Sequence, residues 1–184
     1  MKTLIFSDLH GNSSKLEFLS KIIKEHDKTY CLGDVFQKYG KTIELKELFQ
    51  IQNFFKQHKI ITLPGNCENT QDLKKIKFQK HKLIINLNDN YKALLTHGDS
   101  LDLNSVVSLN NQDEFNILIY GHTHIYRLEI IDNLIFANPG SLAYPRNTNE
   151  IITYLSITSE KEELKFDIKE IETNKIIETL NVIR

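Results

Sequence analysis

Three short, mainly apolar segments separated by two amphipathic ones constrain the fold of this chain most strongly. The apolar segments are residues 4–6, 30–32 and 60–63, and no regular alternation of polar residues interrupts them. Residues 14–23 and 42–57, which lie between them, carry apolar side chains at helical spacing. Strands without polar alternation are typical of a parallel sheet covered on both faces. The first third of the chain therefore predicts a strand-helix-strand-helix-strand unit.

Local signals add detail to this unit. Ser14 and Glu17 have the spacing of a capping box, which places the start of the first helix there. We expect the inner face of the second helix to consist of its apolar residues, namely Ile43, Leu45, Leu48, Phe49, Ile51, Phe54 and Phe55. Beyond the third strand, the lysines at 74, 75, 77, 80 and 82 are interpreted as the solvated face of a helix rather than a nucleic-acid site.

The second half of the chain predicts more antiparallel pairing. A hairpin is expected around residues 88–90 and another around residues 132–133. The remaining expected strands are residues 117–120, 151–158, 164–171 and 176–183. This order favours a three-layer or four-layer α/β sandwich of two packed sheets. Because no linker divides the chain, we expect one domain over residues 1–184.

Composition limits the classes of function. Lys+Arg number 23 against 24 for Asp+Glu, a net charge of −1 that argues against a protein that coats nucleic acid. Two cysteines, Cys31 and Cys67, are too few for a disulfide framework and fit a reducing compartment. No apolar run approaches the ~20 residues of a membrane span, and residues 3–6 are too short for a signal-peptide core. We therefore expect a soluble, cytoplasmic protein without a membrane partner.

Residue types that bind metals follow five of the expected strands, and most lie beside a glycine. They are Asp8, His10, Asp34, Asn66, His97, His122 and His124. Ligands of open α/β sheets bind beyond the carboxyl ends of the strands, so we expect these side chains to meet at one edge. Each alone is also consistent with an ordinary turn. Their joint occurrence at strand ends, with His26, His58 and His81 elsewhere, favours a metal site.

The ligand types narrow the choice of metal. Two carboxylates, one amide oxygen and four imidazoles suit Mn²⁺, Fe²⁺ or Zn²⁺. Seven ligands are too many for one such ion and suit two ions that share a carboxylate, for which Asp34 is the natural bridge. The positive charge of two divalent ions exceeds the negative charge of two carboxylates, so the loaded site would be positive. A positive site suits a phosphate ester.

These motifs resemble the signature of a known family, the calcineurin-like metallophosphoesterase superfamily. The resemblance covers residues 3 to about 145 and rests on Asp8-Leu9-His10, Gly33-Asp34, Gly65-Asn66, His97 and Gly121-His122-Thr123-His124. Gly65-Asn66-Cys67-Glu68 and Asn138-Pro139-Gly140-Ser141 are similar to the small YfcE-type phosphodiesterases of bacteria and archaea. The resemblance implies an α/β fold, a four-layer αββα sandwich of two packed mixed β-sheets.

The resemblance also implies roles for the ligand residues. The first metal would be held by Asp8, His10, Asp34 and His124. The second would be held by Asp34, Asn66, His97 and His122. A metal-bridging hydroxide would attack phosphorus in line, with Asp34, Asn66, His97, His122 and His124 as the catalytic set. We expect two divalent ions, Mn first, with Zn, Fe, Ni, Co and Mg as alternatives.

Two departures bear on the substrate. Most of the superfamily has His where Cys67 stands, and an unperturbed thiol is a poor general acid at neutral pH. This favours phosphodiesters over phosphomonoesters. Asp99 replaces another common His. The sequence leaves two roles open for Arg127 and Arg146, namely phosphate binding and an ordinary position on the surface.

The expected partner is therefore a small phosphate ester, with no sequence-specific nucleic acid, and the sequence is compatible with a homo-oligomer. Two alternatives stay open. One is a phosphomonoesterase or nucleotidase that uses the same site. The other is a non-catalytic protein-binding scaffold, because a eukaryotic retromer subunit resembles this fold.

Overall fold

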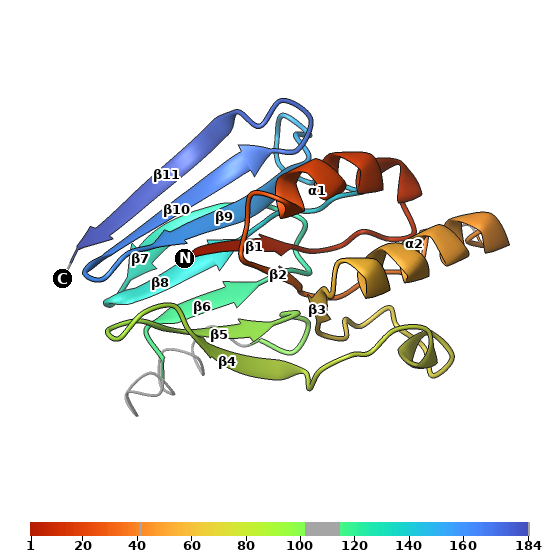
Figure 1. Ribbon diagram of the computed structural model, residues 1–184, viewed down its shortest axis with the longest axis horizontal. Helices are drawn as coiled ribbons and strands as arrows, with labels where there is room; N and C mark the ends of the chain where they lie inside the picture. Colours follow the sequence, from red (N-terminus) through yellow and green to blue (C-terminus); the bar gives the residue numbers. More distant parts are fainter. Residues whose placement is uncertain (41, 102–114, 184) are drawn as a thin grey trace.

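Two mixed β-sheets pack against each other in the computed structural model, which describes residues 1–40, 42–101 and 115–183 (Figure 1). The six-stranded sheet contains β1 (Lys2–Phe6), β2 (Lys28–Cys31), β3 (Ile61–Thr62), β9 (Thr153–Ser159), β10 (Glu163–Glu170) and β11 (Ile176–Ile183). Its order is β11-β10-β9-β1-β2-β3. The five-stranded sheet contains β4 (Lys82–Asn86), β5 (Lys92–Thr96), β6 (Ile117–Tyr120), β7 (Arg127–Ile131) and β8 (Leu134–Asn138). Its order is β4-β5-β6-β8-β7.

Both sheets combine parallel and antiparallel pairs of strands. Strands β1, β2 and β3 are parallel, while β9, β10 and β11 continue the sheet in antiparallel fashion. In the other sheet, β5, β6 and β8 are parallel, and the edge strands β4 and β7 are antiparallel to their neighbours. The expected change from parallel to antiparallel pairing is therefore confirmed. The carboxyl ends of β1, β2, β5 and β6 all lie toward one end of the molecule (Figure 1).

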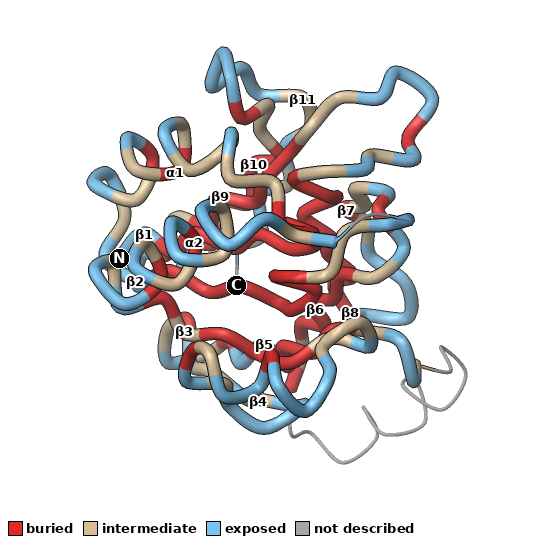
Figure 2. The backbone as a smooth tube through the Cα atoms, turned by 90° about the vertical axis from the view of Figure 1, so that its right-hand side faces the viewer, coloured by how far each residue is buried: buried red, intermediate tan, exposed pale blue. Residues whose placement is uncertain are grey.

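Helices α1 (Leu16–Ile23) and α2 (Leu45–Gln57) lie along the outer side of the six-stranded sheet (Figure 1). Side chains of a strand alternate between its two faces. Leu4 and Phe6 accordingly pack toward the helices, and the Phe6 and Phe55 rings meet edge-on with centroids 6.1 Å apart. Ile5 faces the other way, into the core between the sheets. Figure 2 shows this buried interior running through the strands of both sheets.

The predicted α/β class is confirmed in its two packed mixed sheets and in the α-helices outside the six-stranded sheet; the described residues place no α-helix on the outer face of the five-stranded sheet. The outer face of the five-stranded sheet carries a third apolar cluster, with Leu101 packed against it. The members of this cluster are Leu94, Phe115, Leu118, Tyr120, Leu134 and Phe136.

Within the described residues, no helix has both the length and the apolar character needed to cross a membrane.

The predicted capping box of the first helix is wrong. A short 3-10 turn, η1 (Ser13–Lys15), precedes α1, and the Ser14 hydroxyl donates to Asn12 Oδ1 at 2.6 Å instead of capping the helix. The capping box lies on α2, where Glu44 and Glu47 each accept from the other's backbone N–H. Serine competes for local backbone and side-chain partners, so its spacing alone does not locate a cap.

Two other expectations about residues 42–82 are wrong. Helix α2 begins at Leu45, and both Leu45 and Phe49 are exposed, at 71% and 58%. They lie one turn apart on the face opposite Ile51, because residues four apart share a helix face. The lysines from 74 onward do not form a helical face. Only the 3-10 turn η2 (Asp72–Lys74) is present there, Lys75 pairs with Asp72 at 2.5 Å, and Lys82 begins β4.

Candidate metal centre

The seven residues expected to bind metal follow the ends of β1, β2, β3, β5 and β6. Five of them have a left-handed backbone, namely Asp8 (φ 57°), His10 (44°), Asp34 (54°), His122 (64°) and His124 (62°). The described residues contain ten non-glycine positions with positive φ, so half of them lie in this set. Such conformations cost about 1–3 kcal/mol each and persist only where the surrounding structure holds them. The strain makes this end of the sheets the candidate functional site.

Two glycines let the loops approach closely. A Cβ atom at Gly65 would overlap the Asp34 carboxylate, and one at Gly121 would overlap the Ser7 hydroxyl and crowd Asp8. Any larger residue at either position would push these carboxylates away from the shared centre.

The first group of ligand atoms joins Asp8, His10 and His124, all of which are buried. The Nε2 atoms of the two histidines are 3.2 Å apart, and His124 Nε2 is 3.2 Å from Asp8 Oδ1. His10 Nδ1 donates to Gln37 O at 2.7 Å, and His124 Nδ1 donates to Tyr144 O at 2.8 Å. A carbonyl oxygen only accepts, so each neutral ring carries its proton on Nδ1 and presents a lone pair from Nε2.

The carboxylate of Asp34 lies between this group and the remaining ligands. Asp34 Oδ2 is 3.7 Å from His10 Nε2 and 3.5 Å from His97 Nε2. Asp34 Oδ1 accepts from the Cys67 backbone N–H at 2.9 Å. One oxygen is therefore held by the protein, while the other faces histidines of both groups.

Asn66 joins His97 and His122 in the second group. Asn66 Oδ1 is 2.9 Å from His97 Nε2 and 2.9 Å from His122 Nδ1. His97 Nδ1 donates to Leu32 O at 3.0 Å, which turns its Nε2 toward Asn66 and Asp34. His122 also contacts Asp8, because its backbone N–H donates to Asp8 Oδ2 at 3.2 Å. All seven predicted side chains thus lie in one connected cluster.

Burial and neighbouring charges shift the pKa values of Asp34, His97 and His10. Burial by itself would raise the pKa of Asp34, but the hydrogen bond and charge of His97 outweigh it and hold that pKa well below its usual value. Burial would likewise lower the pKa of His97, but Asp34 outweighs it and raises that pKa to about 8. For His10, burial prevails over the carboxylates and lowers the pKa, so its ring is neutral at pH 7.

The donor set fits divalent cations. Asp8 Oδ1 is buried and has no hydrogen-bond partner among the described residues. Two imidazole lone pairs face each other at 3.2 Å, an arrangement that a positive charge between them stabilises. Ligand atoms also converge in two further groups, Asp8-Asp34-His97 and His10-Asp34-Cys67. Carboxylate, imidazole and thiol together suit borderline divalent metals.

Three residues contribute to the site in addition to the seven predicted ligands. Cys67 brings its sulfur within 4.8 Å of ligand atoms of His10 and Asp34. The Glu68 carboxylate accepts from the backbone N–H groups of Asp34, Val35 and Gly65 at 3.1, 2.5 and 2.6 Å. The position of Glu68 directly after the Gly65-Asn66-Cys67 turn was the one local signal for this role, and its partners depend on how closely two turns approach.

A third such contributor, the buried Asp72, accepts a hydrogen bond from the Gln37 side chain at 2.6 Å. It thereby fixes the residue whose carbonyl orients His10.

Other residues named from the sequence lie apart from the ligands. Asp99 is exposed in the turn after His97. Arg127 pairs with Glu129 and donates to the Tyr120 hydroxyl, so its positive charge is already compensated on β7. Arg146 is exposed, and its backbone N–H donates to His124 O at 2.9 Å.

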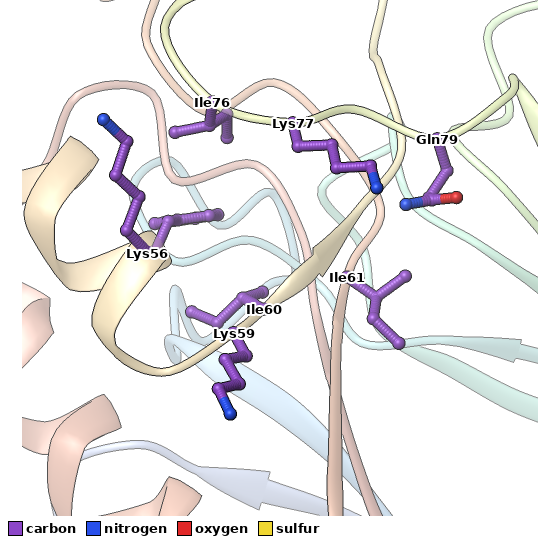
Figure 3. A pocket seen from close by; sticks show the side chains of 8 residues that line it. Lys56, Lys59, Ile60, Ile61, Ile76, Lys77 and Gln79 are labelled. Carbon is purple, nitrogen blue, oxygen red and sulfur yellow. The ribbon is translucent and has the colours of Figure 1, made fainter.

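A pocket of about 300 Å³ lies elsewhere, between the end of α2 and residues 76–79, and contains none of the seven residues. Lys56, Lys59 and Lys77 line it, and Figure 3 shows their ammonium groups pointing away from one another. It therefore offers no convergent anion site, and the strand-end cluster is the stronger candidate.

Comparison with known proteins identifies the family of this chain. The family model of the calcineurin-like phosphoesterase superfamily domain matches residues 1–162 of this chain. Phosphodiesterase YfcE of Escherichia coli strain K12 is 26% identical over 160 residues, which cover 81% of this chain and 83% of that protein. The solved structure of the E. coli phosphoesterase Yfce is similar with a TM-score of 0.76 and 22% identity, covering 98% of both chains.

A third relative does not carry the name of a phosphoesterase. Vps29 of Entamoeba histolytica, solved in complex with Zn²⁺, has a TM-score of 0.68 at 17% identity and covers 100% of this chain and 99% of its own. At these identities the solved structures show the fold alone. The family model matches most of the chain and therefore shows the family. The chain belongs to the calcineurin-like phosphoesterase superfamily.

Proposed function

We propose that this chain is a dinuclear metal-dependent phosphodiesterase that acts on small phosphate esters. The observation that carries the proposal is the Asp34 carboxylate, whose Oδ2 lies within 3.7 Å of His10 Nε2 and 3.5 Å of His97 Nε2. A carboxylate that faces two groups of ligands is the arrangement expected for a shared ligand of two ions.

The seven side chains divide into two sets around Asp34. Asp8, His10, Asp34 and His124 would hold one ion, and Asp34, Asn66, His97 and His122 would hold the other. When bound, divalent ions supply Lewis-acid charge for the phosphoryl oxygens and lower the pKa of water. We propose Mn²⁺ as the metal, with Zn²⁺ and Fe²⁺ as alternatives that the imidazole and carboxylate ligands also suit.

The protein's own part is to keep the ligands in a competent state. Backbone carbonyls of Gln37, Leu32 and Tyr144 accept from the Nδ1 atoms of three histidines, so each Nε2 faces the site, where a bound cation would replace the proton that Asp34 favours on His97. Hydrogen bonds to the second nitrogen of a ligand histidine raise its basicity and orient its ring. Glu68 holds the backbone of Asp34 and of the neighbouring Gly65 turn.

Cys67 supports a preference for diesters. Burial, and then the neighbouring Asp34, raise the pKa of its thiol to about 12. Such a thiol is neither a ready nucleophile nor an effective proton donor at neutral pH. A neutral side chain at this position also adds no positive charge to the site, so it suits the monoanionic phosphate of a diester better than the dianion of a monoester.

Hydrolysis assays with added Mn²⁺ test the proposal. We expect the metal-loaded protein to hydrolyse bis(p-nitrophenyl) phosphate, to lose this activity with EDTA, and to show a lower kcat/KM for p-nitrophenyl phosphate. A higher kcat/KM for the monoester would favour the phosphomonoesterase alternative. Absence of hydrolysis of both esters by protein with confirmed bound metal would favour the protein-binding scaffold, which the shared fold with Vps29 keeps as the second alternative.

A further inference from the structure

Two tyrosines form an exposed aromatic wall beside the metal centre. Tyr39 is 48% exposed and Tyr144 is 37% exposed, and their ring centroids are 5.1 Å apart. Both rings contact His10, with centroid distances of 4.7 Å for Tyr39 and 5.4 Å for Tyr144. Tyr39 also lies 6.0 Å from the His124 ring. Exposed rings in contact with two ligand histidines border the place where a bound ester would lie.

The wall is tied to the ligands through the backbone. Tyr144 O accepts from His124 Nδ1, and Gln37 O, two residues before Tyr39, accepts from His10 Nδ1. The same loops that orient the two histidines therefore carry the two tyrosines. These hydrogen bonds anchor the backbone from which the two rings extend.

The chemistry of the wall is aromatic rather than ionic. A hollow of about 190 Å³ beside it is lined by His10, Asn12, Lys38, Ala143 and Tyr144. Lys38 Nζ pairs with Glu47 at 2.6 Å, so its charge is already compensated.

The spacing of the rings determines how a ligand can bind. The two rings are in contact at an angle of 51°, so nothing flat fits between them. A flat group can instead stack on an exposed ring face, an interaction that tolerates many aromatic groups.

We propose that Tyr39 and Tyr144 form an aromatic subsite that binds a flat organic group of the phosphate ester. The substrate class is then phosphodiesters that carry a nucleobase or an aryl group. This inference rests on the proposed phosphoesterase function, because that function places the phosphate at the metal centre beside the wall.

Equilibrium binding tests the subsite without relying on turnover. Titration calorimetry with Mn²⁺ present compares thymidine monophosphate, phenyl phosphate and methyl phosphate, which share a phosphate and differ in the attached group. We expect at least one aromatic ligand to bind about tenfold more tightly than methyl phosphate. A preference for thymidine monophosphate alone identifies a nucleoside ester, and a preference for phenyl phosphate alone identifies a simple aryl ester.

Variants assign the preference to the two rings. Tyr39→Leu and Tyr144→Leu should each reduce the aromatic preference severalfold, while Tyr39→Phe keeps it. Phe49→Leu, which changes an exposed ring on α2, is the matched control and should leave it unchanged. Metal content measured for each variant shows that the site is intact.

The outcomes separate this inference from the proposed function. Equal affinity for all three ligands, absence of binding, or an aromatic preference that survives both leucine variants would overturn the subsite. A clear aromatic preference in a protein that hydrolyses no ester would leave the subsite standing and overturn the proposed function.

Discussion

The Glu68 carboxylate accepts a hydrogen bond from the backbone N–H of Asp34, with 3.1 Å between Glu68 Oε2 and the nitrogen. The same carboxylate accepts from Val35 and Gly65, so it connects the turn after β2 with the turn after β3. Asp34 has a left-handed backbone that an aspartate adopts only when its surroundings compensate the strain. Glu68 supplies this compensation and positions the carboxylate that faces both groups of ligands.

Replacing Glu68 with alanine should therefore weaken metal binding without removing a ligand. We expect a loss of about 10–100-fold in Mn²⁺ affinity, the usual cost of removing a residue that orients a metal ligand. Titration calorimetry measures it, and Glu162→Ala, an exposed carboxylate on the surface, is the control. If the Glu68 variant binds Mn²⁺ as tightly as the unchanged chain, Glu68 does not position the site.

Asp34→Asn should cost more activity than any other single ligand change. An amide at this position supplies no charge to either ion, whereas the other ligands each serve one. The kcat/KM values of single variants at the seven ligand positions decide the order. An Asp34→Asn enzyme that is more active than Asn66→Ala would show that Asp34 is not the shared ligand.

Cys67→Ser should keep diesterase activity within about tenfold, a barrier change near 1.4 kcal/mol. A thiol whose pKa is raised to about 12 is mainly protonated at neutral pH, so a hydroxyl replaces it with little loss. Loss of several orders of magnitude would instead identify Cys67 as a nucleophile.

Cys67→His should raise the monoester-to-diester ratio of kcat/KM, because imidazole can donate a proton near pH 7. The ratio cancels differences in metal loading between preparations. If the ratio is unchanged while both metals are bound, position 67 does not set the substrate class.

His26 gives a prediction away from the metal centre. Its Nδ1 donates to Ile22 O at 2.8 Å, its Nε2 is 2.8 Å from Ser156 Oγ, and burial is the main cause that lowers its pKa from 6.5. The unfolded chain then binds a proton more readily than the folded one. The contribution of His26 to stability is complete above about pH 6.5 and is lost as the pH falls through and below that value.

Urea unfolding at several pH values measures this effect. The free energy of unfolding should fall more steeply between about pH 7 and 5 for the unchanged chain than for His26→Gln, which has no proton to gain. Parallel curves for the two proteins would show that His26 does not couple folding to pH.

The ligands themselves were predictable because each is a chemically distinctive residue at a strand end. It is enough to locate the strand ends approximately to place Asp8, Asp34 and His97 at one edge of the sheets. The parallel pairing of β1 with β2 then brings Asp8 and Asp34 together. Glu68 was not predictable in this way, since its partners depend on how closely the turns after β2 and β3 approach.

The same reasoning explains the errors in the helices. Leu45 and Phe49 are apolar yet exposed, because their position around α2 relative to the sheet depends on how the helix packs. The outer side of a helix also tolerates apolar residues, so composition alone does not assign its inner face. The Tyr39–Tyr144 wall likewise joins loops more than 100 residues apart in sequence, and local patterns do not report such contacts.

The central claim is that two ions share Asp34, and the most direct measurement is electron paramagnetic resonance of the Mn²⁺-loaded protein at defined stoichiometry. We predict that the protein binds two Mn²⁺ per chain and gives the broadened spectrum of an exchange-coupled pair, and that Asp34→Asn abolishes the coupling. Saturation at one Mn²⁺ per chain, or a spectrum of isolated ions with both sites filled, would contradict the account.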